Sequence, residues 1–362
     1  MKLPKLDELF PEQKKIQFHE EDENLFVAGP PGSGKTSLAV FRAKYLKELG
    51  KSVVVVTRNK MLAALTSQLD GNGLKTYTMN QFVGTVFYAR TKQTLPQIVP
   101  FVYHWDAIQA ASAAVQGAPD LDHLIIDEGQ NLPAAFFRWA VPYGAKNLTV
   151  FADEDQTTDA ERSSFADICN AGMPAPIRLT ANHRNTAEIA AVAEHFHRSN
   201  LLPPAIVQRR RGGETPRLER YQSWDDLVGQ VSRRFTNRAQ VMGVIVYRRE
   251  EVLLVRDKLK AALPADARVE AYVSNGTDLP NNFRLLEPGV TIMSSESAIG
   301  LEFDVVYLQD LHRSLPCGST EDFRRMYMLC ARARDSLILV DGPDALSLNQ
   351  ISQLPGPALL SR

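Results

Sequence analysis

The residues best suited to chemistry in this sequence form a short glycine-rich segment, GPPGSGKT (29–36). Its spacing, G-x-x-x-x-G-K-[ST] after an apolar run and before a helical stretch, is typical of a phosphate-binding loop. Glycines let backbone N–H groups close around phosphate oxygens, and the N-terminus of the following helix adds partial positive charge. A chance glycine-rich loop is the alternative, and the flanking strand and helix argue against it. The segment therefore predicts a nucleotide-phosphate site.

Within this loop the side chains have different expected roles. Lys35 is expected to pair with the β- and γ-phosphates, and Thr36 to bind Mg²⁺ through its hydroxyl. The residues expected to contact the nucleotide are Gly29, Pro30, Pro31, Gly32, Ser33, Gly34, Lys35, Thr36 and Ser37.

A second motif, LIIDEGQ (124–130), places two acids at the end of an apolar run. Asp127 is expected at the edge of a sheet, where it can bind Mg²⁺, and Glu128 is expected to orient or deprotonate the attacking water. An Asp-Glu pair after an apolar strand is weak evidence alone, but behind a phosphate-binding loop it is strong. The two motifs together predict hydrolysis of a nucleoside triphosphate.

These motifs require strands to position them, and short runs of Val, Ile and Leu supply candidates. The runs alternate with helical stretches, which is typical of parallel sheets covered on both faces. The fold class is therefore expected to be α/β. The predicted strands are LFVAG (25–29), VVVVT (53–57), LIID (124–127), LTVFA (148–152), VMGVIVY (241–247), VTIM (290–293), VVYL (305–308) and LILVD (337–341).

Two helices are predicted from apolar periodicity. The first is expected to end at Gly50, and its apolar face carries Leu38, Phe41, Tyr45 and Leu49. The second is expected to begin near Asn185, with Glu188 three residues on as its capping-box partner. The apolar stripe of this second helix consists of Ile189, Val192 and Phe196.

The strands fall into two groups on either side of MPAPI (173–177), a segment that resembles a linker. We therefore expect two α/β domains, residues 1–177 and 178–362, with a cleft between them. In open α/β sheets, ligands bind at the carboxyl ends of the strands, where both motifs lie.

Composition places the chain among ordinary globular proteins, with 44% hydrophobic and 23% charged residues among its 362. A net charge of −1 offers no whole-chain argument for a polyanionic partner. The three cysteines are far apart and odd in number, so they predict neither a disulfide framework nor a metal site. With no signal-like start and no membrane-length apolar run, we expect a cytoplasmic protein without a membrane partner.

Six segments occur in a characteristic order: the phosphate-binding loop, DEGQ, ADEDQ (152–156), LTANHRN (179–185), IGLEFD (299–304) and LCARAR (329–334). On these segments the chain resembles superfamily 1 helicases of the Rep/UvrD/PcrA type, from about Pro11 to about Val340. The resemblance implies two RecA-like P-loop NTPase domains with ATP in the cleft between them. It also implies Mg²⁺-dependent ATP hydrolysis and single-stranded DNA or RNA as a partner.

The resemblance assigns three residues to the nucleoside. Gln13 would read the edge of the adenine, and Glu302 would hold the ribose. His183 stands where the family usually has a tyrosine stacked on the adenine, so an aromatic ring is retained there.

Four further residues are assigned by the resemblance to the γ-phosphate. Gln130 and Gln156 would sense it, and Arg184 and Arg332 would contact it from the second domain as arginine fingers. Charge on the transferring group would then be neutralised from both sides of a cleft, which requires the domains to close. The alternative for either arginine is a surface ion pair.

The nucleic-acid contacts of the family are retained only in part. The corresponding positions that keep a suitable residue are Asn59, Thr78, Phe82 and Arg162. Asp159 and Glu161 stand where the family has aromatic residues that stack on bases, and Glu296 and Ile299 stand where it usually has His and Lys. Because stacking contributes about 1–3 kcal/mol per base and carboxylates repel phosphates, we expect weak binding of single strands.

The chain is also too short for the accessory domains of the family. Residues 83–120 and 250–288 leave no room for the insertions usual in each half. We therefore expect a nearly bare two-domain motor or switch with weak autonomous unwinding. A protein partner such as a nuclease, acting in DNA repair or in defence against foreign DNA, would supply the missing grip or activity.

Two other functions are compatible with a phosphate-binding loop. One is an ATP-gated protein-interaction module that hydrolyses ATP without moving on nucleic acid, its acidic loop contacting a protein. The other is a P-loop kinase or small-molecule NTPase, which is disfavoured because the paired arginines and the GLEF segment have no role there.

Overall fold

The computed structural model describes residues 3, 6–58, 60–71, 73–100, 102–153, 163–198, 206–208, 213–273, 283–309, 311–342 and 344–362. The chain divides into two compact units, an N-terminal unit that ends at Thr180 and a C-terminal unit that begins at Ala181. The division lies three residues beyond the predicted boundary at 177. Ile177–Arg178 pairs with the first strand of the N-terminal unit, and the Leu179 N–H donates to the Ala28 carbonyl at 2.7 Å.

The N-terminal unit is built on a six-stranded parallel sheet with the order β3-β2-β6-β7-β1-β8. Its strands are β1 (Leu25–Ala28), β2 (Val53–Thr57), β3 (Lys75–Thr78), β6 (His123–Ile126), β7 (Asn147–Ala152) and β8 (Ile177–Arg178). The phosphate-binding loop follows β1, and the two acids of LIIDEGQ follow β6. Since strands of a parallel sheet end at one edge, both motifs lie at that edge.

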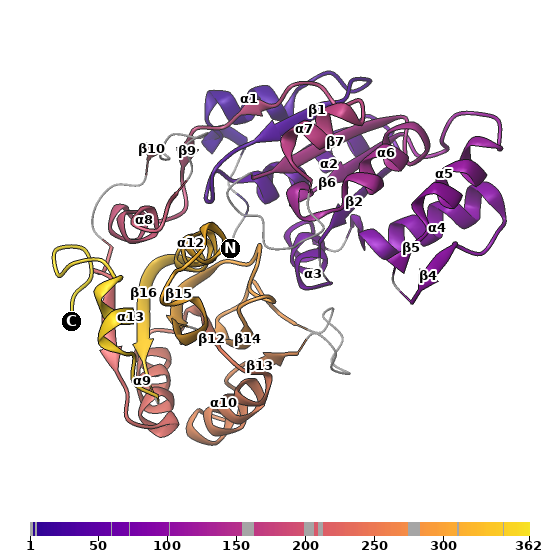
Figure 1. The fold of residues 1–362 in the computed structure, drawn as a ribbon. Helices are drawn as coiled ribbons and strands as arrows, with labels where there is room; N and C mark the ends of the chain where they lie inside the picture. Colours follow the sequence, from indigo (N-terminus) through magenta and orange to yellow (C-terminus); the bar gives the residue numbers. More distant parts are fainter. Residues whose placement is uncertain are drawn as a thin grey trace. The chain divides into compact units, whose positions relative to one another are not determined.

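Helices and short 3-10 turns surround this sheet (Figure 1). They are η1 (Leu6–Glu8), α1 (Pro11–Gln17), α2 (Lys35–Glu48), α3 (Lys60–Leu69), α4 (Met79–Thr91), α5 (Trp105–Ala113), η2 (Gly129–Asn131), α6 (Ala134–Tyr143) and α7 (Phe165–Asn170). The helix that leaves the phosphate-binding loop, α2, packs against β2, β6 and β7.

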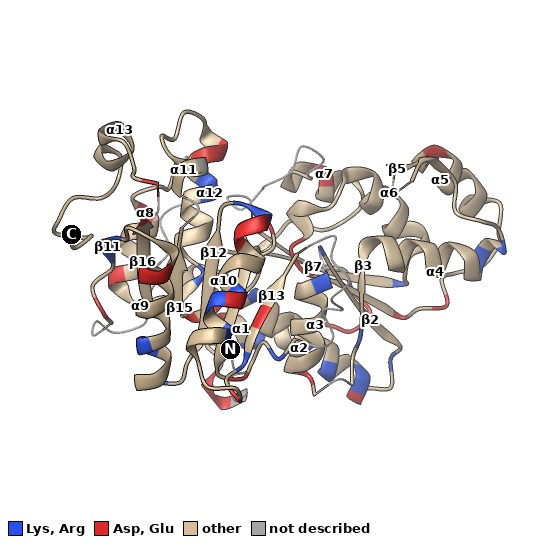
Figure 2. Cartoon of the chain, turned by 90° about the horizontal axis from the view of Figure 1, so that it is seen from below, with Lys and Arg blue, Asp and Glu red and all other residues tan. Residues whose placement is uncertain are grey.

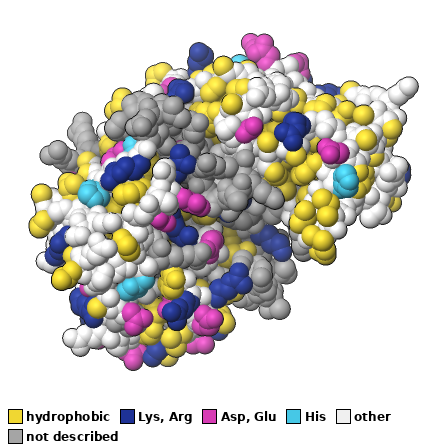
Figure 3. Space-filling view, viewed as in Figure 1, with side chains coloured by type: hydrophobic (Ala, Val, Ile, Leu, Met, Phe, Trp, Pro, Cys, Tyr) yellow, Lys and Arg dark blue, Asp and Glu magenta, His cyan; other side chains and the backbone are white. Residues whose placement is uncertain are grey.

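A small insertion separates β3 from β6. It contains α4, α5 and an antiparallel hairpin of β4 (Gln97–Val99) and β5 (Val102–Tyr103), which extend to one side of the sheet of this unit (Figure 1). Ile98, Val99 and Val102 of the hairpin are exposed. The space-filling view shows hydrophobic side chains on this part of the unit, interspersed with side chains of other types (Figure 3).

The C-terminal unit has a second six-stranded parallel sheet, with the order β11-β16-β15-β12-β14-β13. Its strands are β11 (Arg217–Arg220), β12 (Val241–Val246), β13 (Val269–Tyr272), β14 (Gly289–Ser294), β15 (Phe303–Leu308) and β16 (Ala333–Asp341). A separate two-stranded parallel sheet joins β9 (Ala181–Asn182) to β10 (Ile206–Val207). The α/β class with two parallel sheets is thus confirmed.

The helices of the C-terminal unit accompany its larger sheet. They are α8 (Ala187–Glu194), α9 (Trp224–Asn237), α10 (Arg249–Ala262), α11 (Leu311–Ser314), α12 (Thr320–Cys330) and α13 (Leu348–Ser352). The helix α10 packs on β12, β13 and β14, whereas α8 packs on α12 and β16.

Every strand predicted from an apolar run is present within a few residues of its predicted bounds. These runs form the four central strands of each six-stranded sheet. The strands at the edges, β3, β8, β11 and β13, were not predicted. An edge strand has one neighbour and often an exposed face, so it is shorter or more polar and carries a weaker pattern.

The first predicted helix is confirmed as α2, but its buried face is different. Gly50 has a φ of +83°, the left-handed conformation that ends the helix as predicted. Leu49, however, is exposed, and Arg42 is fully buried. The Arg42 guanidinium donates to the carbonyls of Gln17, His19 and Glu20. This buried arginine therefore anchors the segment that follows α1.

The second predicted helix is also present, and its capping residue is corrected. The N-cap of α8 is Thr186, whose hydroxyl accepts from the Ile189 N–H. Asn185 is not the cap, because its side chain binds elsewhere in the C-terminal unit. The predicted stripe of Ile189, Val192 and Phe196 is buried.

Each unit has its own hydrophobic core. One cluster, which includes Phe136 and Trp139, lies in the N-terminal unit, and another, which includes Val244 and Ile292, lies in the C-terminal unit. Basic and acidic residues are interspersed along the elements of both units (Figure 2). In the described parts of the chain, no helix combines the length and apolar character needed to cross a membrane.

Candidate nucleotide-binding site

The loop between β1 and α2 has the backbone of a phosphate-binding loop. Gly34, the N-cap of α2, has a left-handed φ of +86°, and a Cβ added there would lie 3.1 Å from the Gln13 Nε2. A Cβ added at Gly29 would come within 2.8 Å of the Leu179 Cβ. Glycine is therefore required at both positions, for conformation at one and for close packing at the other.

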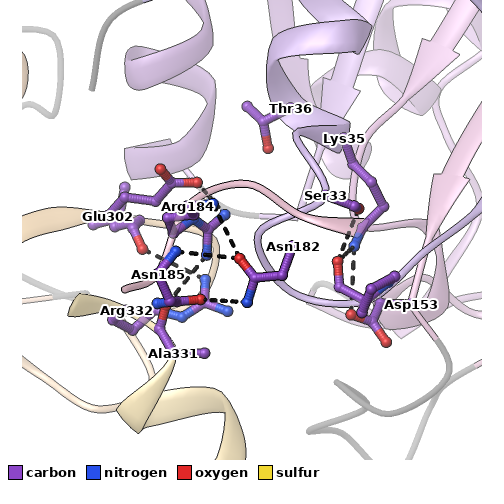
Figure 4. Close-up of polar contacts among 12 residues, drawn as sticks. Ser33, Lys35, Thr36, Asp153, Asn182, Arg184, Asn185, Glu302, Ala331 and Arg332 are labelled. Atoms are coloured by element: carbon purple, nitrogen blue, oxygen red, sulfur yellow. Dashed lines mark hydrogen bonds and ion pairs between the residues drawn. The ribbon is translucent and has the colours of Figure 1, made fainter. Parts of the chain in front are cut away.

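Lys35 lies almost completely buried within this loop. Its Nζ donates to the carbonyls of Gly29 at 2.6 Å and Pro30 at 3.0 Å, and lies 3.4 Å from the Asp153 carboxylate (Figure 4). The ammonium is thus held by carbonyl groups of the loop backbone. The negatively charged oxygens of a bound phosphate would attract it more strongly than these neutral carbonyls do. Asp153 was not predicted, although its place directly after β7 is where the sheet-edge rule looks for ligands.

Thr36 and Asp127 form the pair expected to hold Mg²⁺. The Thr36 hydroxyl donates to the Asp127 carboxylate at 2.7 Å, across 91 residues of sequence. Asp127 is fully buried, and its pKa is raised to about 7 by burial and then by the charge of Glu128. A hydroxyl beside a buried carboxylate is a donor set that suits Mg²⁺, which is usually bound through one or two protein oxygens together with phosphate and water.

The acids in the part of the chain that the structure describes do not form a metal site by themselves. Among the described residues, no group of three or more His, Cys, Asp and Glu side chains is placed to hold a metal ion. The Thr36–Asp127 pair suits an ion that takes further ligands from a nucleotide and from water, as Mg²⁺ does in P-loop proteins.

Glu128 is held in an unusual backbone conformation next to this pair. Its φ of +61° is left-handed, and its N–H donates to the Asp127 carboxylate at 3.1 Å. The Gln130 Nε2 donates to the Glu128 carboxylate at 2.6 Å, and the Gln130 Oε1 accepts from the Asp153 N–H at 3.0 Å. Gln130 therefore links the predicted base to the end of β7. Strained residues of this kind cluster at functional sites.

Gln13 reaches the same loop from α1. Its Nε2 donates to the Ser33 carbonyl at 3.1 Å, and its Oε1 accepts from the Phe10 N–H at 3.1 Å. The side chain is buried, so it contacts the loop backbone rather than solvent. This contact brings Gln13, a residue predicted to bind the nucleotide, to the phosphate-binding loop.

The C-terminal unit brings together two residues that were given separate roles. The Arg184 guanidinium forms an ion pair with the Glu302 carboxylate and donates to the Ala331 carbonyl at 3.3 Å (Figure 4). Arg332 is buried and donates to the carbonyls of Met328 at 2.9 Å and Leu301 at 3.4 Å. His183, beside Arg184, is half-buried. Both arginines thus lie in one cluster of the C-terminal unit.

Some residues predicted to contact nucleic acid, and one predicted to sense the γ-phosphate, fall outside the described part of the chain. Asn59, Gln156 and Arg162 lie outside the described residues, as do Asp159 and Glu161. Glu296 and Ile299 stand where the helicase family usually has His and Lys. The Glu296 carboxylate lies 3.4 Å from the Arg325 guanidinium, and Ile299 is buried.

The two described residues of that set have structural roles. Phe82 is fully buried, with its ring packed edge-on against those of Phe136 and Trp139. The prediction that Phe82 contacts a strand of nucleic acid is therefore corrected. The ring is part of the hydrophobic core, and neither of its faces is exposed. Thr78 caps α4 in a capping box with Gln81.

Comparison with known proteins agrees with the phosphate-binding loop. Residues 13–161 match the family model described as an AAA domain. A search among curated proteins gives no match. The matched segment covers less than half of the chain and contains Lys35, Thr36, Asp127 and Glu128.

Among solved structures, the chain is similar to the C-terminal domain of a possible DNA helicase from Lactobacillus plantarum WCFS1. That similarity has 21% identity and a TM-score of 0.35, and covers 50% of this chain and 98% of the other. The chain is also similar to PRRSV helicase, with 13% identity and a TM-score of 0.43, over 91% of this chain and 54% of the other. It therefore spans about half the length of that helicase.

Proposed function

We propose that this protein is an Mg²⁺-dependent ATPase of the helicase-like type, which acts as a motor or switch on single-stranded DNA or RNA. The observation that carries the proposal is the contact between Thr36 and Asp127, with Lys35 and Glu128 at the same edge of one sheet. This arrangement corresponds to the parts that recur in P-loop NTPases.

The residues divide the chemistry among themselves. Backbone N–H groups of the loop and the Lys35 ammonium bind the phosphates, and Thr36 and Asp127 hold the metal. When bound, Mg²⁺ supplies positive charge at the β- and γ-phosphate oxygens. Glu128, oriented by Gln130, aligns the attacking water and accepts its proton.

Arg184 and Arg332 would act on the charge that develops on the γ-phosphate during transfer. In that role the Arg184–Glu302 ion pair has to open, since a guanidinium bound to a carboxylate is not free for a phosphate. The nucleotide would then replace Glu302 as the partner of Arg184, and Glu302 would become available to the ribose hydroxyls. Nucleotide binding would thereby be coupled to the positions of the Arg184 and Arg332 side chains.

A second candidate function is an ATP-gated protein-interaction module. It is favoured by the burial of Phe82, which removes one expected contact with nucleic acid. It is also favoured by the exposed apolar side chains of the β4–β5 hairpin, Ile98, Val99 and Val102. In this function the chain hydrolyses ATP, and its nucleotide state controls assembly with a protein such as a nuclease. Nucleic acid would then be held by that partner.

The test is steady-state ATP hydrolysis by the full chain, with and without single-stranded DNA and RNA. Hydrolysis that requires Mg²⁺, is lost in Lys35→Ala and rises several-fold with a single strand supports the motor. Hydrolysis that no nucleic acid stimulates supports the interaction module. Hydrolysis that survives in Lys35→Ala at the wild-type rate would overturn both, because the phosphate charge would not need its proposed counter-ion.

A further inference from the structure

Two buried asparagines connect the segment that carries Arg184 to the segment that carries Arg332. The Asn182 Nδ2 donates to the Asn185 Oδ1 at 2.9 Å, so the two carboxamides form one unit (Figure 4). Asn185 is only 1% exposed. We call Asn182 and Asn185 the asparagine clasp.

The Asn185 side chain holds the backbone on both sides of Arg332. Its Nδ2 donates to the Ala331 carbonyl at 3.0 Å and to the Ala333 carbonyl at 2.5 Å. Both N–H bonds and the oxygen of this carboxamide are therefore in use. Because buried polar groups must be paired, this position requires a side chain with two donors and one acceptor.

The Asn182 side chain holds the backbone of Arg184 in the same way. Its Oδ1 accepts from the N–H of Arg184 at 3.0 Å and from the N–H of Asn185 at 3.2 Å. The direction in which the Arg184 side chain leaves the backbone is thus set by Asn182. The carbonyl of Ala331, which Asn185 binds, also accepts from the Arg184 guanidinium.

The clasp is not explained by the secondary structure around it. Thr186, not Asn185, caps α8, and β9 pairs with β10 rather than with β16. The carboxamides instead link a loop to the point where β16 begins. Such contacts determine the spacing between two side chains rather than the ends of a helix or strand.

We propose that Asn185, supported by Asn182, is a positioning residue that holds Arg184 and Arg332 at one fixed spacing for ATP hydrolysis. The inference rests on the proposed function, in which both guanidinium groups contact the γ-phosphate. A misplacement of about 1 Å can cost about 10²-fold in rate, so the spacing matters more for turnover than for binding.

The experiment compares Asn185→Asp with the wild-type protein. The change keeps the size of the side chain but places a carboxylate against two carbonyl oxygens, so both bonds to Ala331 and Ala333 are lost. We expect kcat for ATP to fall about 10- to 100-fold, while KM changes by less than about 3-fold. Asn185→Ser keeps one hydrogen-bond donor and adds no charge. It should therefore fold more readily than Asn185→Asp, and its kcat should fall less.

Gln309→Glu is the matched control. Gln309 is also a buried carboxamide of the C-terminal unit, with its Nε2 donating to the Gly342 carbonyl and its Oε1 accepting from the Tyr247 N–H. It lies after β15 and contacts the residue after β16, at the opposite ends of these strands from Arg332. This variant should be destabilised in thermal unfolding like Asn185→Asp, yet keep its kcat once measured well below its Tm.

Hydrogen exchange of the protein without nucleotide provides a second readout. The amides of Arg184 and Asn185 should be protected in the wild type and in Gln309→Glu, and should exchange faster in Asn185→Asp and Asn185→Ser. Rapid exchange of these amides in the wild type would overturn the clasp itself.

The outcomes separate the inference from the proposed function. If the wild type hydrolyses ATP and folded Asn185→Asp or Asn185→Ser keeps the wild-type kcat, the inference fails and the proposed function stands. If the wild type does not hydrolyse ATP, the proposed function fails and this role of Asn185 fails with it. A rise in KM with unchanged kcat would also contradict positioning for turnover.

Discussion

At the scale of single residues, burial decides what the acids beside the phosphate-binding loop can do. Asp127 is fully buried next to Glu128, and its pKa is raised to about 7 by burial and by that neighbouring charge. A carboxylate in this position is stabilised by a cation, so the proposed metal and a proton compete for it. Glu128 accepts a hydrogen bond from Gln130, which holds its carboxylate in position for the proposed role on the attacking water.

Glu128→Gln should bind ATP but turn it over at least about 100-fold more slowly, because general-base catalysis contributes about 10²–10⁴ in rate. The Gln130 Nε2 can still donate to the amide oxygen at 128, and Asp127 and Thr36 are unchanged, so affinity should stay within about 3-fold. Equilibrium nucleotide binding and steady-state turnover measure the two effects. Glu48→Gln, an exposed change at the end of α2, is the control. Wild-type turnover in Glu128→Gln would mean that another group orients the water.

Arg184→Ala should reduce turnover by about 10³-fold with little change in nucleotide affinity, since an arginine finger acts on charge that develops during transfer. Arg332→Ala should do the same and also lower the free energy of unfolding by about 1–3 kcal/mol, because its guanidinium pairs the buried carbonyls of Met328 and Leu301. Turnover, affinity and urea unfolding distinguish the two variants. Weaker binding at unchanged turnover would place the arginines in ground-state binding instead.

At the scale of elements, α2 connects the phosphate-binding loop to the segment that follows α1. Its first turn carries Lys35 and Thr36, and its interior carries Arg42, which binds the carbonyls of Gln17, His19 and Glu20. Since α1 also carries Gln13, which contacts the phosphate-binding loop at Ser33, the buried arginine helps to hold a second element beside that loop.

Arg42→Met should lower the free energy of unfolding by about 3 kcal/mol, because the buried carbonyls lose their donor while the volume is nearly kept. We also expect weaker nucleotide binding, through looser docking of α1. Lys47→Met, an exposed change on the same helix, should cost less than about 0.5 kcal/mol. Urea unfolding of both variants makes the comparison. A loss in Arg42→Met no larger than in Lys47→Met would show that the carbonyls find water.

The central strand β6 contributes a pH dependence through His123. Burial lowers the pKa of His123 from 6.5 to about 3, with the charge of Arg42 acting in the same direction, and its Nε2 lies 2.8 Å from the Thr149 hydroxyl. Below pH 6.5 the unfolded chain therefore binds a proton that the folded chain does not. Stability should fall as the pH drops from about 6.5 towards 3, by up to about 1.4 kcal/mol per unit from this group, and be unaffected by it above 6.5.

Unfolding of the wild type and of His123→Gln at pH 7.5 and pH 5 measures this contribution. The glutamine does not titrate, so the wild type should lose more stability than the variant between the two pH values. Equal losses would mean that His123 is protonated in the folded protein.

At the scale of the whole molecule, the two units carry complementary parts of the proposed chemistry. The N-terminal unit holds the phosphate-binding loop and both acids, and the C-terminal unit holds the arginine cluster and its asparagine clasp. Each has its own parallel sheet and its own core, which is what independent folding requires. Nucleotide binding and turnover should therefore be separable by dividing the chain.

A fragment of residues 1–180 should fold and bind ATP but not hydrolyse it at a measurable rate, because Arg184 and Arg332 are absent. A fragment ending at residue 176 lacks β8 and Leu179, which pair with β1 and pack at Gly29, so it should be less stable and bind more weakly. Thermal unfolding and nucleotide binding compare the two. Hydrolysis by the longer fragment at the rate of the full chain would remove the arginines from the mechanism.

What the sequence determined by itself was the local part of this protein. The phosphate-binding loop, the Asp127–Glu128 pair and the central strands of both sheets were all predicted, because each depends on residues close together in the chain or on a continuous apolar run. A strand buried on both faces carries that run whatever surrounds it. The α/β class followed from the alternation of such runs with helices.

What only the tertiary structure decided are the contacts between distant segments. Nothing near Phe82 in the sequence indicates that its ring packs against those of Phe136 and Trp139. Likewise, nothing near Arg42 indicates that its guanidinium donates to three backbone carbonyls. Asn185 looked like a helix cap, since asparagine is a common one. Its carboxamide instead pairs with carbonyls nearly 150 residues away. A buried polar side chain pairs with the buried polar groups that have no other partner. Which groups these are depends on the tertiary structure and not on the neighbouring sequence.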